Sequence, residues 1–468
     1  MALLIKNGQI VTANDTYIAD ILCDGEVIQR IDRDIEVPEG SDVEVIDASG
    51  KYVFPGFIDP HVHIYLPFMG TYAKDTYASA GRGALVGGTT TLIEMCCPGR
   101  EDDPLEAFHL WNSKAEDVAP CDYTFHMGVT RFDDSTASQL KEIVNEGISS
   151  FKVFLAYKGA FGIDDTELYN TLDLARELGV IVTAHCENET LVNEKQKALL
   201  AAGKTGPEYH EPSRPTRVEA EGVSHLMTFA ELTGAHVYVV HTSCDEALQA
   251  AQAARYRGVH AYVETVIPYL VMDNTWAERP DFEGAKYVMS PPIRDKRHQP
   301  ILWDALRTRL ISTVATDHAP FDFVGQKEMG RDDFTLIPNG IPSVEHRVPL
   351  LYTHGVKTGR IDLNTFVDAA STQAAKIFGL YPRKGTIQIG SDADLVIFDP
   401  NWKGTISVER QEMATDYSAF EGWEQDGRPD IVTVRGKVQV RDGSFVGDLG
   451  HGQLLRREAT YRTVEPEQ

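Results

Sequence analysis

The chain has 468 residues, 42% of them hydrophobic and 24% charged, and its formal net charge is −26. Its length suits one large domain with a smaller one, its acidic excess argues against a nucleic-acid partner, and no apolar run reaches the ~18 residues of a membrane span. The N-terminus lacks the basic region and apolar core of a signal peptide. The six cysteines form no CxxC pair and no disulfide framework. We therefore expect a cytoplasmic protein.

The two ends of the chain are predicted to form one small β-domain. Residues 1–55 contain LLIKNGQIVT, DILCDGEVIQRI and VEVIDASGKYV, in which apolar and polar residues alternate between glycine turns. Residues 384–446 contain GSDADLVIFDP and DIVTVRGKVQVRDG, which have the same pattern. We therefore expect a β-sandwich domain assembled from residues 1–55 and 384–446.

The middle of the chain, residues 56–383, alternates apolar strands with helical segments. The strand candidates are YVFPGFID, TTTLIEM, YTFHMGV, FKVFLAY, VIVTAHC, VYVVHTS, HAYVETV and STVATDH. One helix is well marked, because Asp164 can cap its start, Glu167 follows three residues later and Gly179 can end it. Apolar strands separated by helices indicate a parallel sheet, and eight such units predict a (β/α)8 TIM barrel of the α/β class, with its active site at the C-terminal ends of the strands.

The last segment, residues 447–468, is polar and charged. It can be a disordered tail or an arm that clasps a neighbouring subunit, and the sequence leaves both interpretations open.

Six side chains that can bind a metal fall at the C-terminal ends of the predicted strands or within them. In PGFIDPHVH, two histidines stand two residues apart, so in an extended chain they point to the same face and can bind one ion. A single HxH motif is a weak signal, but the other candidates lie on the fourth, fifth, sixth and eighth strands and would meet at the same rim. The set is His61, His63, Lys152, His185, His241 and Asp317.

Lys152 lies inside the apolar strand SFKVFL, where an unpaired ammonium group would be costly. One interpretation is a lysine that extends to the rim or pairs with a carboxylate. The alternative is that the neutral amine reacts with carbon dioxide to form a carbamate, an anion whose two oxygens can bridge two cations.

Long motifs in the same order resemble the cyclic amidohydrolases of the amidohydrolase superfamily, most closely the hydantoinase/dihydropyrimidinase family. They are PGFIDPHVH, LPFMGTYAKD, GGTTT, SFKVFLAYKGAFGIDD, TAHCENE, VVHTS, TDHAPF, IPNGIPSVEHRVPLLY and KGTIQIGSDADLVIFDP, and they span nearly the whole chain. The resemblance implies a binuclear metal-dependent hydrolase that opens a hydantoin or dihydropyrimidine ring to an N-carbamoyl amino acid. It also implies two zinc ions and a homo-oligomer, a tetramer or a dimer.

The resemblance assigns a role to each candidate residue. It places the more buried metal ion on His61, His63 and Asp317 and the more exposed one on His185 and His241. It implies that Lys152 is carboxylated (N6-carboxylysine) and bridges the two ions, that Asp317 and Tyr157 are catalytic, and that Tyr157, Ser290 and Asn339 bind the substrate. Taken alone, Ser290 and Asn339 read as ordinary turn residues.

Two segments depart from the family pattern, Ala261–Leu270 and Glu94–Pro98, and the resemblance places the second in a loop over the substrate. The same resemblance puts Leu66, Phe68, Met69, Cys96 and Phe161 in loops that cover the site. These departures concern the ring substituent and its handedness rather than the reaction class.

The alternatives are an allantoinase, a dihydroorotase or a non-catalytic scaffold homologue that has lost its metals. A scaffold is disfavoured because all six ligands are present. Dihydroorotases carry an arginine two residues after the second histidine of HxH, where this chain has Tyr65. Arg294 and Arg297 stand in a charged run, so we expect a surface role for both.

Overall fold

The computed structural model describes residues 2–37 and 42–461. Its centre is a sheet of eight strands in the order β15-β14-β13-β12-β11-β10-β9-β6, with every neighbouring pair parallel. The strands are β6 (Phe57–Val62), β9 (Thr89–Cys96), β10 (Asp122–Gly128), β11 (Ser150–Phe154), β12 (Ile181–His185), β13 (Val237–Val239), β14 (Ala261–Val266) and β15 (Thr313–Ala315). The last strand meets the first just beyond their ends, where the His63 amide donates to the His318 carbonyl at 2.7 Å, so the sheet forms a barrel. The predicted fold class is confirmed.

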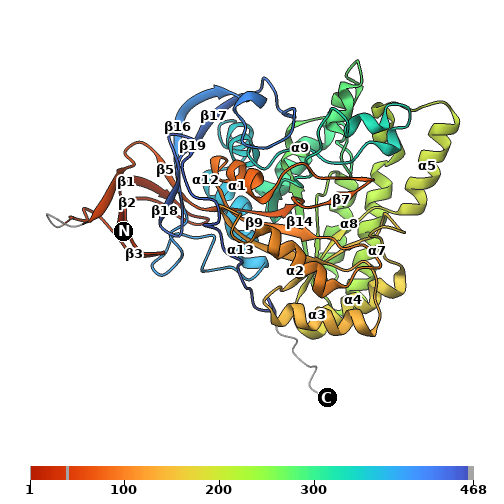
Figure 1. Ribbon diagram of the computed structural model, residues 1–468, viewed down its shortest axis with the longest axis horizontal. Helices are drawn as coiled ribbons and strands as arrows, with labels where there is room; N and C mark the ends of the chain where they lie inside the picture. The colour runs from red at the N-terminus through yellow and green to blue at the C-terminus, as the bar shows by residue number, and fades with distance from the viewer. Residues whose placement is uncertain (1, 38–41, 462–468) are drawn as a thin grey trace.

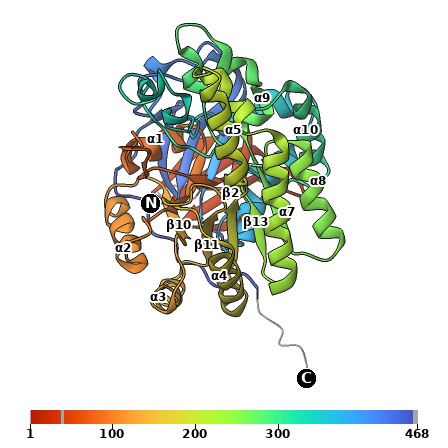
Figure 2. The ribbon, with the colours of Figure 1, turned by 90° about the vertical axis from the view of Figure 1, so that its right-hand side faces the viewer.

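Helices surround this barrel (Figures 1 and 2). They include α1 (Tyr77–Val86), α2 (Pro104–Ala115), α3 (Asp134–Asn145), α4 (Asp165–Leu178), α7 (Thr216–Thr233), α8 (Asp245–Tyr256) and α10 (Gln299–Arg307). Helix α4 begins and ends as predicted, because Asp164 and Glu167 form a reciprocal capping box and Gly179 adopts φ 68°. Helix α5 (Glu189–Ala201) extends away from the barrel at the right of Figure 1.

Strands from both chain ends build the second unit, a nine-stranded sheet at the left of Figure 1. The strands are β1 (Ala2–Val11), β2 (Thr16–Asp24), β3 (Val27–Asp32), β4 (Val43–Asp47), β5 (Tyr52–Pro55), β16 (Leu395–Thr405), β17 (Glu424–Val434), β18 (Lys437–Arg441) and β19 (Ser444–Phe445). The two ends of the chain join where β5 runs antiparallel to β16, with Val53 opposite Ile397.

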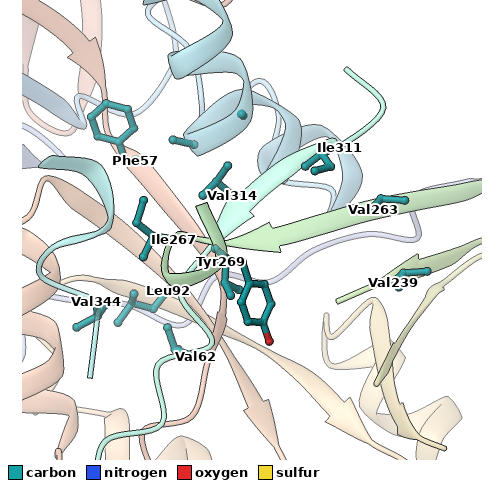
Figure 3. Close-up of a cluster of buried hydrophobic side chains, with 14 of the residues drawn as sticks. Phe57, Val62, Leu92, Val239, Val263, Ile267, Tyr269, Ile311, Val314 and Val344 are labelled. Atoms are coloured by element: carbon teal, nitrogen blue, oxygen red, sulfur yellow. The ribbon is translucent and has the colours of Figure 1, made fainter. Parts of the chain in front are cut away.

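Alternate residues of the barrel strands pack into two different apolar clusters. Phe151 and Val153 of β11 belong to the larger cluster, which also contains helix residues such as Leu172 of α4. Figure 3 shows part of this layer, with Val239 and Val263 on two neighbouring strands. Since successive side chains of a strand point to opposite faces, the residues between these face the barrel interior.

Residues 447–461 pack against the barrel of their own chain. The amide of Leu455 donates to the Tyr123 carbonyl at 2.7 Å, and the Leu455 side chain is fully buried. The Tyr461 ring stacks on His236 with a centroid distance of 3.6 Å. These contacts hold residues 447–461 on the surface of their own barrel, and residues 462–468 lie outside the described part of the chain. Among the described residues, no helix is long and apolar enough to cross a bilayer.

Candidate metal centre

The strands direct the predicted ligands to one point inside the barrel. Lys152 stands between Phe151 and Val153, which pack toward the helices, so its side chain points to the interior. His185 is the last residue of β12, and His241 and Asp317 follow two residues after β13 and β15. All six predicted ligands are buried.

Three of these residues bring their ligand atoms together. His61 Nε2 lies 3.3 Å from His63 Nε2, and Asp317 Oδ1 lies 3.1 Å and 3.3 Å from these two nitrogens. All three atoms lie within 4.8 Å of one another. Two imidazole nitrogens and a carboxylate oxygen are donors that suit zinc and other divalent metals.

A second pair stands beside this group. His185 Nδ1 lies 2.9 Å from His241 Nε2, and both side chains line the same pocket as Lys152. Lys152 is fully buried, and its Nζ atom has no hydrogen-bond partner among the described residues. An isolated buried ammonium group is costly, so this nitrogen fits a centre in which it carries or contacts another group. The donor set therefore suits two metal ions.

Burial and charge set the protonation of these groups. Burial lowers the pKa of His63 to about 4, and burial together with His185 lowers the pKa of His241 well below its usual value. Burial also lowers the pKa of Lys152. For His61, burial opposes the charged form, but Glu264 and Asp317 outweigh burial and raise the pKa to about 8. Neutral imidazole and neutral amine are the forms that bind metal and carbon dioxide, respectively.

Three of the candidate residues have a backbone conformation that is rare for residues other than glycine. The φ angles of Tyr157, His241 and Asp317 are 64°, 38° and 51°. Such angles cost free energy, and they cluster at functional sites because the surrounding structure enforces them. The strain gives a second reason, independent of residue type, to place the site here.

Buried carboxylates orient the histidines. His61 Nδ1 lies 2.7 Å from Glu264, and Glu264 also accepts a hydrogen bond from the His241 amide at 2.8 Å. His185 Nε2 lies 2.9 Å from Glu187. Neither carboxylate was predicted from the sequence, although Glu264 has the feature that marked Lys152, a charged residue within an apolar strand.

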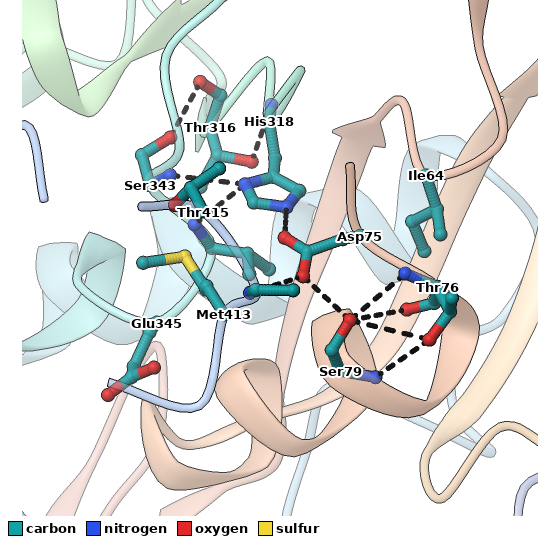
Figure 4. Close-up of polar contacts among 12 residues, drawn as sticks. Ile64, Asp75, Thr76, Ser79, Thr316, His318, Ser343, Glu345, Met413 and Thr415 are labelled. Carbon is teal, nitrogen blue, oxygen red and sulfur yellow. Dashed lines mark hydrogen bonds and ion pairs between the residues drawn. The ribbon is translucent and has the colours of Figure 1, made fainter. Parts of the chain in front are cut away.

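His318 follows Asp317 but points elsewhere, as the alternation of an extended chain predicts. Its Nε2 atom lies 3.0 Å from Asp75, and its Nδ1 atom accepts from the Ser343 amide at 3.1 Å (Figure 4). Asp75 also accepts from the Ser79 hydroxyl at 2.6 Å. This network fixes the segment that carries Asp317.

A pocket opens onto the ligand cluster, and all three predicted substrate-binding residues line it. Tyr157, Ser290 and Asn339 share it with the metal candidates, and the side-chain amide of Asn339 donates to the Tyr157 hydroxyl at 3.4 Å. The apolar part of its wall includes Leu66, Phe68, Phe154, Phe161 and Ala319. The structure thus brings an apolar wall, a phenol and two loop residues to the rim that carries the candidate metal ligands.

Two predicted pocket residues lie elsewhere. Cys96 is fully buried within β9 and packs in the layer between strands and helices, because β9 continues through Glu94–Cys96 instead of ending in a loop. Met69 lines a neighbouring cavity of about 160 Å³ that shares Tyr157 and Asn339 with the pocket.

The surface role predicted for Arg294 is wrong. Its side chain is buried, donates to the Ser243 hydroxyl at 2.8 Å and pairs with Glu219 at 2.9 Å. The prediction failed because Glu219 is remote in sequence from the charged run. Arg297 is exposed, as expected. Tyr65 packs edge-on against Trp111, with ring centroids 4.8 Å apart, and does not line the pocket.

The known proteins that this chain resembles belong to one family. Residues 52–439 match the model of the amidohydrolase family. A D-hydantoinase from Geobacillus stearothermophilus is 48% identical over 458 residues, which cover 98% of this chain and 97% of the relative. The solved D-hydantoinase (dihydropyrimidinase) from a Thermus species is 63% identical with a TM-score of 0.96, covering 98% of this chain and all of that one. A solved dihydropyrimidinase from Brevibacillus agri is 45% identical with a TM-score of 0.97, covering 99% of this chain and all of that one.

Proposed function

The chain belongs to the hydantoinase/dihydropyrimidinase family of the amidohydrolase superfamily, and from this membership we propose that it opens the ring of a cyclic ureide to an N-carbamoyl amino acid. Hydantoins and dihydropyrimidines are the substrate class. The observation that carries the proposal is the convergence of six buried ligand candidates on one rim of the barrel, beside a partly apolar pocket. A ring of modest size with few charges suits such a wall.

We propose that two zinc ions bind at this rim. His61, His63 and Asp317 would hold one ion, and His185 and His241 the other. Lys152, as its carbamate, would supply an oxygen to each. When bound, the ions would supply an acidic water and polarise the substrate carbonyl.

The side chains of the site have distinct tasks in the reaction. Asp317 accepts the proton of the attacking water and delivers it to the leaving ring nitrogen. The Tyr157 hydroxyl donates a hydrogen bond to the reacting carbonyl as negative charge develops on its oxygen. Backbone groups of Ser290 and Asn339 bind the ring amides. Leu66, Phe68 and Phe161 exclude water around the ring and contact its substituent.

The test is ring opening by the purified, zinc-loaded protein on a panel of substrates. The panel contains hydantoin, 5-substituted hydantoins of both hands, dihydrouracil, allantoin and dihydroorotate. Hydantoins or dihydrouracil should be opened, with D-substituents preferred, as the names of the similar proteins suggest. A metal-loaded protein that opens none of these rings would contradict the proposal.

Dihydroorotate should be the poorest of these substrates. Its carboxylate needs a fixed cation such as arginine, and among the described residues no arginine lines the pocket. Arg294 already forms an ion pair with Glu219. We expect kcat/KM at least about a hundredfold lower than for the neutral rings, or roughly 2.7 kcal/mol.

We also propose that the protein is cytoplasmic and associates into a homotetramer or a dimer. Leu232 and Tyr256, near the ends of α7 and α8, are 75% and 83% exposed, and association would remove such apolar surface from water. All six cysteines are buried and unpaired, which suits a reducing compartment. Light scattering coupled to gel filtration measures the assembly.

A further inference from the structure

Lys327 is a fully buried lysine that the proposed mechanism does not use. Its ammonium group donates to three backbone carbonyls, those of Val288 at 2.9 Å, Pro338 at 2.6 Å and Gly340 at 2.7 Å. An ammonium group has three N–H donors, so these acceptors satisfy it completely. Burying it is costly, and no carboxylate of the described residues pairs with it, so the contacts must hold it in place.

The three carbonyls belong to the two loops that carry Ser290 and Asn339. Val288 stands two residues before Ser290, and Pro338 and Gly340 flank Asn339 on both sides. The loops also touch directly, because the Gly340 amide donates to the Val288 carbonyl at 2.9 Å. Lys327 therefore joins the two loops at the point where they face the pocket.

The peptide groups of Ser290 and Asn339 lie in these two loops, and Lys327 does not bond them. Among the described residues, no hydrogen bond engages the backbone amide or carbonyl of either residue. Both residues line the pocket. Their backbone polar groups are thus available to a ligand, while their neighbours are fixed by Lys327.

The segment that carries Lys327 is itself anchored. The Lys327 amide donates to the Asp322 carbonyl at 2.9 Å. Gln326 donates to the Thr71 hydroxyl at 2.7 Å and to the Tyr72 carbonyl at 2.8 Å, in the short hairpin of β7 (Pro67–Phe68) and β8 (Thr71–Tyr72). This hairpin contributes Phe68 to the pocket. One short segment therefore connects three walls of the pocket.

We propose that Lys327 is a positioning residue for substrate recognition. By holding the two loops together, it sets the separation of the backbone groups of Ser290 and Asn339 to match the alternating N–H and C=O groups of a cyclic ureide. This inference rests on the proposed function. It assigns Lys327 no contact with the substrate and no part in the metal centre.

The test compares full-length, metal-loaded wild type with Lys327→Met, which removes the donors and keeps the length of the side chain. Weaker ring binding should raise KM for hydantoin or dihydrouracil at least about tenfold, while kcat changes by less than about threefold. Metal content should not change. Hydrogen exchange should become faster in peptides that cover residues 286–291 and 336–341.

Lys141→Met is the control, because Lys141 lies on α3, pairs with Glu177 and belongs to neither loop. It should leave KM and exchange as in wild type. Lys327→Gln retains two N–H donors and should give a KM between those of wild type and Lys327→Met, and it keeps the test available if Lys327→Met does not fold. Unchanged KM and unchanged exchange in the folded variants, or a parallel fall of kcat and metal content, would overturn the inference. If wild type itself opens no ring, the proposed function fails, and the exchange measurement alone decides whether Lys327 fixes the loops.

Discussion

Glu187 lies 2.9 Å from Nε2 of His185, and this contact leaves Nδ1 of His185 facing Nε2 of His241, 2.9 Å away. Arg214 donates to Glu187 at 2.5 Å. Burial opposes ionisation of Glu187, but Arg214 and His185 outweigh it and lower its pKa to about 2. The imidazole therefore meets a permanent negative charge, which fixes its orientation and raises its basicity as a ligand.

Replacing Glu187 by Gln should weaken metal binding about 10-fold to 100-fold while the fold is kept, because the ligand loses its orienting charge. Competition with a chelator measures the affinity without reference to activity. Glu194→Gln, on the exposed face of α5, is the control, since Lys197 is the one residue of the described ranges that pairs with Glu194. Equal affinities of the Glu187 variant and wild type would contradict the role of this pair.

Replacing Lys152 by Ala should abolish turnover, because the proposed carbamate could no longer form. Short carboxylates such as acetate or propionate should partly restore activity by occupying the space left in the buried site. A crystal structure of the wild type that shows an unmodified Lys152 with two fully occupied metals would exclude the carbamate.

Asp317→Asn should lower turnover at least about a hundredfold, since general acid–base catalysis alone contributes that much. Metal content must be measured on the same sample, because Asp317 Oδ1 lies beside His61 and His63. Near-normal turnover in this variant would remove Asp317 from the proton transfer.

Phe161→Ala should change the preference among 5-substituted hydantoins more than it changes turnover of hydantoin itself. The centroid of the Phe161 ring lies 6.0 Å from that of Phe68, on which it stacks, and 5.5 Å from that of Phe154. Removing this ring therefore enlarges the apolar part of the pocket. The measurement is kcat/KM across substituents of increasing size. A uniform loss on all substrates would indicate general damage to the pocket.

Glu345→Gln should change how stability depends on pH. Burial raises the pKa of Glu345 from 4.5 to about 8 in the folded protein. The folded state then binds a proton that the unfolded state releases, so this group's contribution to stability declines as the pH rises from about 4.5 to 8 and is constant above. Melting temperatures of wild type should fall relative to the variant over this range. Parallel curves for the two proteins would show that Glu345 does not carry the effect, and the exposed Glu424→Gln serves as the control.

The sequence predicted those parts of the molecule that local patterns determine. Strand alternation and the position of each strand end placed His61, Lys152 and His185 on the same rim, and the caps of α4 follow from Asp164 and Gly179. Contacts between remote residues leave no local pattern. The pairing of Arg294 with Glu219 and the packing of Leu455 against β10 therefore emerge only from the folded chain.

The pairing of β5 with β16 has a consequence for synthesis. Strand β5 is complete early, but its antiparallel neighbour is translated only after the entire barrel. During that interval β5 presents an unpaired edge, which is a template for unwanted strand addition. N-terminal segments emerge first from the ribosome, so the barrel can fold before β16 is available to pair with β5. A chain that terminates before Leu395 would keep this open edge permanently, and aggregation would follow even though every side chain of the metal centre had been made.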